Sequence, residues 1–484
     1  MLFVRFCCVL LTAISPAPAL AVEAPTTLQN LTLPACIELA LKNHASLAVS
    51  GAMVEMAEAQ YQQAMSAYWP HVTANSQGTH YNHDFTFNMQ GNIQMPASVG
   101  AAINGALGQN QQTAPIGQAL SHALAQPIPV NLNVKLFDRE ILMSSVNLTY
   151  PIFTGGKITA VTKQAEKGKS IAEENLRKTE LEVIKDVKKY YYGAQFAEQM
   201  EHLASDTLER FQVLEELTER LFKHGSMKVK KTDYLRAKTT TAITRSIYQE
   251  AQYARELAFQ ALANAMGLNW NDNISLSYAN QTTDLPPELA RLVDAAQQFN
   301  PDIQQLKLAI DASDSKISEA YSGYYPAIGF QSSAYTIEST YNSGLMNSTN
   351  RNGWTVGIGL QWSLFDGFET TNKVSYANAM KKQLANQQIL LDQGMALQVK
   401  QQFLRIRSSD LQIKSTQEAN GYATENRKLN VSAYQEELVE TKDVIESQVV
   451  ETFTQSAAYR AHYDLNLALA TLEFLIGSNI QELK

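Results

Sequence analysis

Apolar and polar positions alternate strictly in two short segments of the chain, at 145–152 and 354–364. In the second segment every other position is apolar, namely Trp354, Val356, Ile358, Leu360, Trp362 and Leu364. About ten residues of this pattern predict a β-strand with one apolar and one polar face. Taken alone, such a strand fits the edge of a soluble β-sandwich as well as a strand of an outer-membrane barrel.

Long stretches beside these strands have helical spacing instead. Their apolar residues recur every three or four positions, and they are rich in Ala, Leu, Glu, Lys and Gln, which favour helix. The sequence holds no proline between Pro151 and Pro286 or after Pro326. A helix over 154–222 would be on the order of 100 Å long at about 1.5 Å per residue. This length predicts a coiled coil or a tube, because a compact globule does not need such a helix.

The chain carries an internal duplication. The motif Tyr-Trp-Pro-His-Val at 68–72 returns as Tyr-Tyr-Pro-Ala-Ile at 324–328, which is 256 positions later (326 − 70). Each copy then runs through an alternating segment into a long proline-free stretch. Self-similarity at a fixed register predicts a repeated structural unit.

We therefore divide the chain into a signal peptide at 1–21, a first repeat at 22–280 and a second repeat at 281–484. Each repeat is expected to contain two strands and a long helical hairpin. The strands are predicted at about 70–85, 141–153, 327–341 and 353–365, and the hairpins at 154–267 and 366–477. The stretch at about 86–140, rich in Gly, Ala, Gln, Asn and Pro, is expected to be a weakly ordered surface loop.

The first residues have the features of a secretory signal. Arg5 supplies the positive start, 6–14 the apolar stretch and Ala19-Leu20-Ala21 a small-residue cleavage site. Cleavage there leaves Cys36 as the only cysteine, so the mature chain forms no internal disulfide. We expect an exported protein in which Cys36 is a packing residue.

Charge and aromatic residues narrow the class further. The formal net charge of −8 argues against a nucleic-acid partner, which would favour a basic surface. No apolar run is long enough to predict a membrane-spanning helix. Aromatic residues fall at all four junctions between strands and helices, namely Tyr68, Trp69, Tyr150, Tyr324, Tyr325 and Trp362. Their recurrence favours a girdle at a membrane–water interface over simple packing at a domain joint.

Four strands are too few to close a barrel, since about eight is the smallest number that works. In lipid an open sheet edge would leave backbone groups without hydrogen bonds. The chain is therefore expected to oligomerise, with eight strands from two copies or twelve from three.

No catalytic motif is apparent. His80, His83 and Asp84 could suggest a metal site, but a histidine pair in a loop is the simpler interpretation because no second ligand cluster is in view. The sequence contains neither a glycine-rich phosphate loop nor a nucleophile elbow. We expect no enzyme, no cofactor and no metal.

Several short motifs, in the same order in both repeats, resemble those of the TolC-type outer-membrane efflux proteins. They are Leu31-Thr32-Leu33 followed by Ala40-Leu41-Lys42-Asn43, Asn300-Pro301-Asp302-Ile303, Gly155-Gly156, Phe365-Asp366-Gly367, and Tyr434 with Asp443-Val444-Ile445 and Gln448. The resemblance covers essentially the whole mature chain.

The resemblance implies an α+β membrane protein, a homotrimer whose twelve-stranded outer-membrane β-barrel continues into a long periplasmic α-helical barrel. Such a protein is the exit duct of an efflux or type I secretion system in a Gram-negative bacterium. Its partners are a periplasmic adaptor, an inner-membrane pump and outer-membrane lipid. The alternative from another class is a non-conducting periplasmic coiled-coil scaffold. The substrate is chosen by the pump and is not specified by this sequence.

The resemblance also implies functional residues at the periplasmic tip. Asp443 and Glu446 occupy the positions of acidic rings that form the channel constriction. Two acidic residues three positions apart are also typical of a solvated helix face, and Lys442 with Glu446 is an ordinary i,i+4 pair. Tyr434 and Asp233 match a pair that holds the tip closed.

The two hairpin turns are implied to contact the adaptor, through Gly225 and Ser226 in the first turn and Glu437 in the second. The chain departs from the family pattern in this region. Val439 stands where the family usually has the arginine of the latch, and Glu437 stands where it has a turn glycine.

Overall fold

The computed structural model describes residues 27–137, 139–270, 272–277, 286–339, 351–478 and 480. The predicted signal peptide at 1–21 lies outside the described residues. The chain forms two compact units, which we call the helical unit and the sheet unit. The helical unit comprises 1–58, 167–311 and 381–484, and the sheet unit comprises 59–166 and 312–380.

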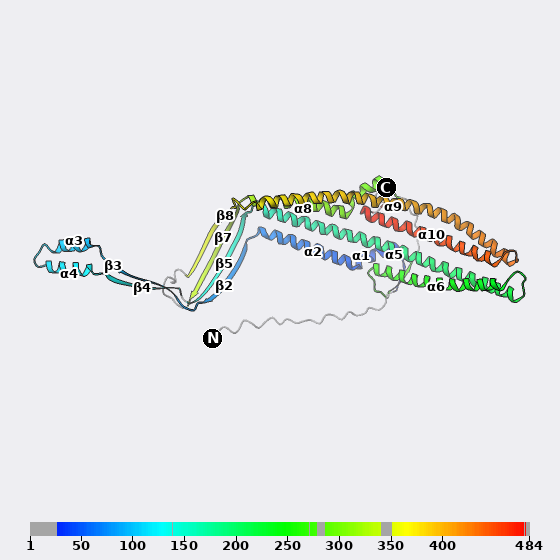
Figure 1. The fold of residues 1–484 in the computed structure, drawn as a ribbon, viewed down its shortest axis with the longest axis horizontal. Helices are drawn as coiled ribbons and strands as arrows, with labels where there is room; N and C mark the ends of the chain where they lie inside the picture. The colour runs from blue at the N-terminus through cyan, green and yellow to red at the C-terminus, as the bar shows by residue number, and fades with distance from the viewer. Residues whose placement is uncertain are drawn as a thin grey trace. The chain divides into compact units, whose positions relative to one another are not determined.

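The sheet unit contains a four-stranded antiparallel sheet with the strand order β2-β5-β7-β8 (Figure 1). Each half of the chain contributes two neighbouring strands. Their bounds are His71–His80 for β2, Glu140–Phe153 for β5, Ala327–Ser339 for β7 and Asn352–Gln361 for β8. Among the described residues β2 and β8 each have a strand partner on one side only, so the sheet has two open edges.

The strand register gives the sheet two different faces, because directly opposite residues in an antiparallel pair share a face. One face carries the row Val72, Leu148, Ser332 and Val356, and the adjacent row contains Tyr150, Phe330 and Ile358. Trp354, Val356, Ile358 and Leu360 of β8 are all exposed on this face, with 76% exposure for Trp354 and 71% for Ile358.

The opposite face of the sheet is mainly polar. Its row of Thr73, Asn147, Ser333 and Thr355 contains no apolar residue, and the Ser333 hydroxyl donates a hydrogen bond of 2.7 Å to Asn147 Oδ1. Large apolar residues, among them Met143 and Ile337, occur on this face toward the end of the sheet near β3 and β4. The sheet therefore presents an apolar surface on one side and a polar surface on the other.

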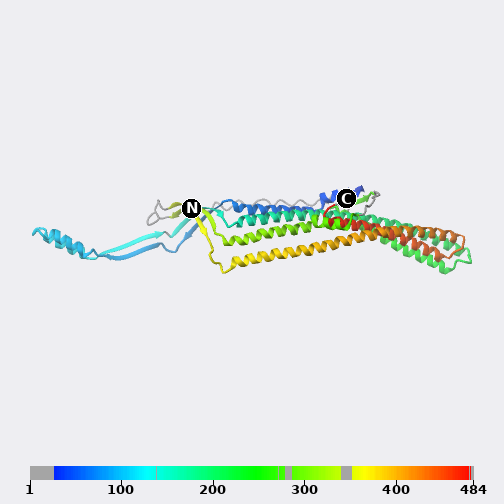
Figure 2. The same ribbon diagram turned by 90° about the horizontal axis from the view of Figure 1, so that it is seen from above.

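The expected loop at about 86–140 is not a loop, and this expectation was wrong. The segment forms an antiparallel ribbon of β3 and β4 that ends in the helices α3 and α4, which pack against each other (Figures 1 and 2). The bounds are Phe85–Ile93 for β3, Ala97–Leu107 for α3, Ala114–Ala125 for α4 and Ile128–Phe137 for β4. The Gly, Ala, Gln, Asn and Pro in this stretch led to the prediction of a loop, although apolar and polar residues alternate in both strands, as at Phe85, Phe87 and Met89 of β3.

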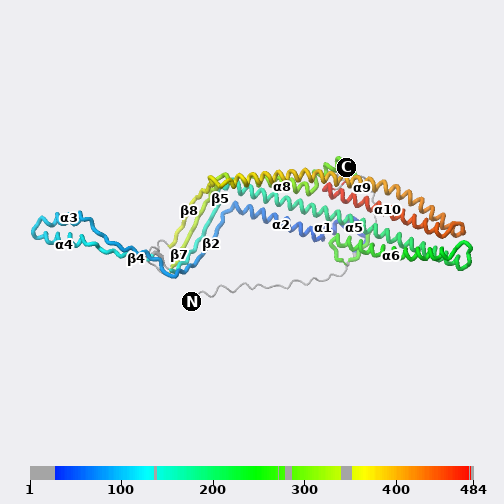
Figure 3. The backbone as a smooth tube through the Cα atoms, in the orientation of Figure 1, coloured from blue at the N-terminus to red at the C-terminus, as the bar shows by residue number. Residues whose placement is uncertain are grey.

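The helices of the two halves have nearly the same lengths. The two longest have 67 residues each and are followed by partners of 35 and 36 residues. These four helices are α5 (Lys157–Lys223), α9 (Glu369–Gln435), α6 (Lys231–Ala265) and α10 (Thr441–Ile476), and they can be followed in Figure 3. Both long helices begin three residues later than predicted, after the turns that contain Gly155-Gly156 and Gly367.

Shorter helices lead into the strands. They are α1 (Leu33–Asn43), α2 (Ala45–Met65), α7 (Leu289–Phe299) and α8 (Pro301–Tyr321), and single 3₁₀ turns at Ser66–Tyr68 and Ser322–Tyr324 follow α2 and α8. Pro70 and Pro326 come directly before β2 and β7, where the missing N–H prevents continuation of the helix. No helix among the described residues combines the length and the apolar character needed to cross a bilayer.

Two apolar clusters organise the helical unit. One cluster surrounds the fully buried Cys36, Leu262 and Met266, beside the parallel pair of β1 (Thr27–Leu31) and β6 (Asn273–Leu276). The other joins α7 and α10 to α9, with Leu292, Val399 and Leu472 at its centre. A third and smaller cluster lies at the far ends of the long helices, where the sequence placed its candidate functional residues.

Candidate functional site at the ends of the helical hairpins

The turns that join α5 to α6 and α9 to α10 contact each other. The Ser226 hydroxyl donates to Glu437 Oε2 at 3.2 Å, and the Lys228 ammonium donates to the Glu437 carbonyl oxygen at 2.6 Å. The three predicted turn residues Gly225, Ser226 and Glu437 are therefore brought together from two distant parts of the sequence. Lys228 of the first turn takes part in the same contact.

Both turns require a residue with left-handed backbone conformation. Gly225 has φ of +78°, and Glu437 has φ of +56°. This conformation costs roughly 1–2 kcal/mol for a residue with a Cβ atom. The hydrogen bonds from Ser226 and Lys228 offset part of this cost at Glu437, which explains how glutamate occupies a glycine position.

Tyr434 is buried at the base of the second turn, with 3% exposure. Its hydroxyl lies 3.0 Å from Thr218 Oγ1 of α5 and 2.9 Å from Thr441 Oγ1 of α10. The Thr218 hydroxyl donates to the Leu214 carbonyl at 2.7 Å, so it must accept the proton of Tyr434. Thr441 then donates to the tyrosine oxygen, and the chain of hydrogen bonds runs from Thr441 through Tyr434 and Thr218 to the Leu214 carbonyl, which accepts the last one.

Apolar side chains surround this hydrogen-bonded chain. Phe211, Leu214 and Val444 are buried with Tyr434, and partly buried residues pack around them, namely Leu217, Leu221, Val431, Val439 and Ile445. Val439, which stands in place of the latch arginine, is therefore part of an apolar contact. The second hairpin is held against α5 by packing and by a buried hydroxyl pair.

Asp233 and Asp443 occupy equivalent places in the first turns of α6 and α10. The Asp233 carboxylate accepts the backbone N–H of Lys230 at 3.0 Å, and the Asp443 carboxylate accepts that of Glu440 at 3.0 Å. Such contacts satisfy helix N-termini, which also favour negative charge. The Asp233 carboxylate also lies 3.7 Å from the Arg236 guanidinium. The Tyr434 hydroxyl instead bonds to Thr218 and Thr441, so the two residues of the implied latch pair have different bonding partners.

Asp443 and Glu446 are both exposed and lie three positions apart on α10, so they share one helix face. Farther along α10, Val449, Val450 and Phe453 are also exposed, with 71% exposure for Phe453. In a single copy of the chain this strip of carboxylates and apolar side chains is uncovered.

Sequence reasoning missed a buried ion cluster near the same end of the hairpins. Glu451 of α10 has 4% exposure and forms ion pairs with Arg210 of α5 at 2.8 Å and with Arg427 of α9 at 2.5 Å. Each arginine comes from a different long helix. Three widely separated positions form this cluster, and their spacing in the sequence carries no signal for it.

The histidines considered as metal ligands lie apart from this site. His80 Nδ1 is 3.5 Å from Glu140 Oε1, and the His83 ring contacts Asn82 and Phe85. Within the described part of the chain, no three His, Cys, Asp or Glu side chains are grouped so that they could bind a metal.

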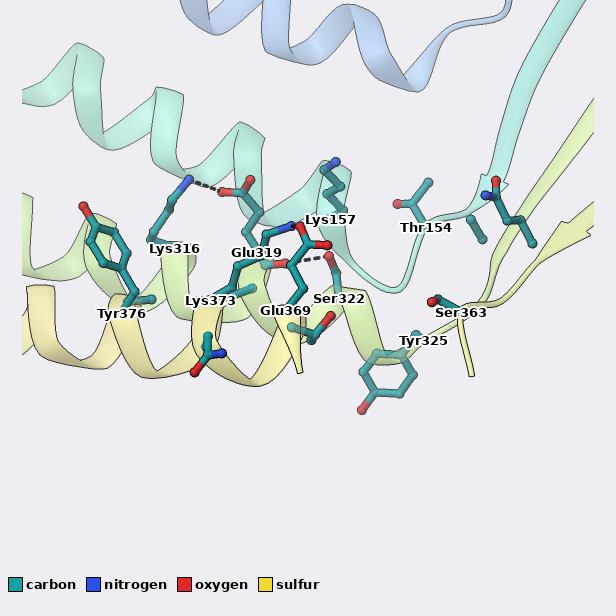
Figure 4. Close-up of a pocket in the computed structure, with 17 residues that line it drawn as sticks. Thr154, Lys157, Lys316, Glu319, Ser322, Tyr325, Ser363, Glu369, Lys373 and Tyr376 are labelled. Carbon is teal, nitrogen blue, oxygen red and sulfur yellow. Dashed lines mark hydrogen bonds and ion pairs between the residues drawn. The ribbon is translucent and has the colours of Figure 1, made fainter. Parts of the chain in front are cut away.

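The sheet unit has a pocket of about 930 Å³ where the strands meet the helices (Figure 4). Its charged residues form two ion pairs, Lys316 with Glu319 at 2.8 Å and Lys373 with Glu369 at 2.6 Å. Lys157 also lines the pocket. Each ion pair joins two residues of the same helix, Lys316 with Glu319 in α8 and Lys373 with Glu369 in α9.

The sequence and the structure of this chain are both similar to those of known proteins. The alkaline protease secretion protein AprF of Pseudomonas aeruginosa is 24% identical over 238 residues, which is 48% of each chain. The match thus spans about half the length of that relative. Among solved structures, CusC is similar with a TM-score of 0.72 and 16% identity, covering 96% of this chain and 98% of that one.

The outer membrane protein VceC of Vibrio cholerae is also similar in structure, with a TM-score of 0.72 and 15% identity. This likeness covers 93% of this chain and 96% of that one. Because the sequence identities are as low as 15–16%, these two structural likenesses establish the fold alone. The family model for outer membrane efflux proteins matches residues 36–268 and 292–478, most of both halves. The chain therefore belongs to the outer membrane efflux protein family.

Proposed function

We propose that this outer-membrane protein is the exit duct of a tripartite efflux or type I secretion system. The observation that carries the proposal is the two-faced sheet with its open edges. Val356 and Ile358 lie on an exposed apolar face, whereas Thr355 and Gly357 lie on the opposite face. A closed barrel of such strands would turn the apolar face to lipid and the polar face to an aqueous lumen.

The open edges support a trimer. A four-stranded sheet in lipid leaves backbone groups of β2 and β8 without hydrogen bonds, which costs several kcal/mol per group. Pairing β8 of one copy with β2 of the next removes both edges, and three copies give twelve strands. The matching helix lengths support a duplicated unit with the boundaries 22–280 and 281–484.

The helical hairpins would form a periplasmic tunnel whose tip is narrowed by Asp443 and Glu446. Three-fold symmetry would gather six carboxylates around one axis and produce a constriction that attracts cations. The latch that we assigned to Tyr434 and Asp233 would act through Tyr434 and Thr218, while Asp233 stabilises the start of α6.

The joined turns offer a surface for a periplasmic adaptor. Gly225, Ser226 and Glu437 form one continuous contact, and Lys228 adds a cation beside them. An inner-membrane pump would then supply the substrate. The name of the similar AprF, a protease secretion protein, favours type I secretion of protein as one route.

Single-channel recording in a planar bilayer tests the duct. The wild type should give a small, cation-preferring current, and the double variant Asp443→Asn with Glu446→Gln should give a larger and less selective one. Asparagine retains an acceptor for the Glu440 N–H, so α10 keeps its cap. An unchanged current in the variant would exclude the constriction but not the duct. Silence from both folded proteins would support a periplasmic scaffold instead.

A further inference from the structure

The ribbon and helical hairpin between β2 and β5 contain an unusual charge-free segment. No position from Phe85 to Val134 holds Asp, Glu, Lys or Arg, although such residues make up 18% of the chain. Surfaces in water are normally rich in these residues. The absence of charge over β3, both helices and β4 as far as Val134 indicates that part of this segment is covered in the assembled protein.

The ribbon has an exposed apolar face. The cross-strand pairs Met89 with Leu132 and Ile93 with Ile128 lie on this face, with exposures between 46% and 57%. The pairs that alternate with them are polar, namely Asn88 with Asn133 and Gln90 with Asn131. A two-stranded ribbon has no layer of its own to cover such a face, and isolated ribbons are marginally stable in water.

The helical hairpin at its end leaves apolar side chains uncovered as well. Gly100 of α3 approaches Ser121 of α4, and Gly117 approaches Leu107, so the two helices already pack closely. Ile116 nevertheless keeps 60% exposure and Leu120 46%. The apolar residues that face outward from the hairpin therefore need a partner beyond this copy.

We infer that the apolar faces of these extensions pack against one another in the oligomer, so that the covering partner is a second copy of this chain. The ribbon prolongs the hairpin of β2 and β5: His80 pairs with Glu140, the Tyr81 N–H donates to the Arg139 carbonyl at 2.7 Å, and Phe85 pairs with Phe137. It therefore starts at the open edge strand through which neighbouring copies would join, and this inference rests on the trimer proposed above.

The lack of charged residues from Phe85 to Val134 is suited to contact with a second copy of the same segment. Where the extensions meet at the three-fold axis, each side chain lies beside its own copies, so a charged residue there would meet like charges. Uncharged apolar and amide side chains avoid this repulsion. A partner of different sequence would instead allow complementary charges, and the segment carries none.

Cysteine cross-linking of the full-length protein tests the contact. Met89→Cys and Leu120→Cys place a thiol on the apolar face, and Gln90→Cys is the matched control on the opposite face. Cys36 is fully buried, so the wild type measures the background. With copper phenanthroline or a short bismaleimide, we expect covalent dimers and trimers several-fold more abundant for the apolar-face variants than for the control.

The outcomes separate the contact from the duct. If the protein forms a trimer in detergent but no variant cross-links above background, the contact is refuted and the proposed duct stands. If quenching by brominated lipids reaches a fluorophore on Met89→Cys, the partner is a bilayer and the inference is overturned. If light scattering finds only monomers in detergent, the proposed trimer itself fails, and the contact fails with it.

Discussion

The hydroxyl groups of Tyr434 and Thr218 lie 3.0 Å apart in a site where both residues are almost fully buried. Tyr434 belongs to the end of α9 and Thr218 to the end of α5, so this bond joins the two long helices of the chain. Buried hydroxyl pairs are costly to break, because the hydrogen bond that each group loses is not replaced by water. The pair is therefore the simplest candidate for what holds the hairpin ends together.

Replacement of Tyr434 by phenylalanine should loosen the hairpin ends. The change keeps the ring but removes the hydroxyl, so Thr441 loses its acceptor and Thr218 its donor. We expect a loss of about 1–3 kcal/mol in stability at the site. A larger single-channel conductance would follow if this contact keeps the channel narrow. Tyr422→Phe is the matched control, because Tyr422 is exposed on the same helix.

Removal of the buried charge at Glu451 should destabilise the helical unit. In Glu451→Gln the carboxylate that pairs with Arg210 and Arg427 is lost, and Arg427, which is mostly buried, is left without its counter-ion. Breaking a buried ion pair from one side costs about 3–5 kcal/mol. Thermal unfolding of the detergent-purified protein should show a clear decrease in Tm. The same substitution at the exposed Glu446 should change Tm little.

A charge on the apolar face of β8 should impair membrane insertion. Val356→Lys places an ammonium on the exposed apolar face, and about 2–4 kcal/mol is the expected cost near the bilayer midplane. The neighbouring Thr355→Lys places the same charge on the polar face and should be tolerated. Equal recovery of both variants from outer-membrane fractions would contradict the assignment of the two faces.

Cys36 should be unreactive in the folded protein. Burial among apolar residues raises the pKa of its thiol from 9.0 to about 11, so the reactive thiolate is scarce at neutral pH. We expect maleimide to label the wild type only after unfolding. The introduced thiol of Gln90→Cys on the exposed ribbon should react under the same native conditions and serves as the positive control.

The raised thiol pKa also has a consequence for stability. Below pH 9 the thiol is protonated in both the folded and the unfolded chain, so the contribution of Cys36 is constant there. Between pH 9 and about 11 only the unfolded chain releases its proton, so the folded state loses stability in this range. Cys36→Ala should reduce this loss when unfolding is followed across that window.

The sequence alone determined the elements that depend on local pattern. Alternation identified β8, the lack of proline identified α5 and α9, and the duplicated motif around Pro70 and Pro326 located the start of β2 and β7. These predictions succeeded because backbone conformation follows side-chain spacing over a few residues. The family resemblance, now supported by the family match, came from the order of such short motifs.

Tertiary structure alone decided which distant residues meet. The pairing of β3 with β4 became visible only in the structure, because a helical hairpin separates the two strands and alternation within a strand does not identify its partner. Tyr434 and Thr218 contact each other although they lie more than 200 positions apart in the sequence, and so do Glu451 and Arg210. Glu451 and Arg427 are only 24 positions apart but lie on different helices. Such contacts depend on how helix faces are rotated against each other, and sequence spacing does not encode that rotation.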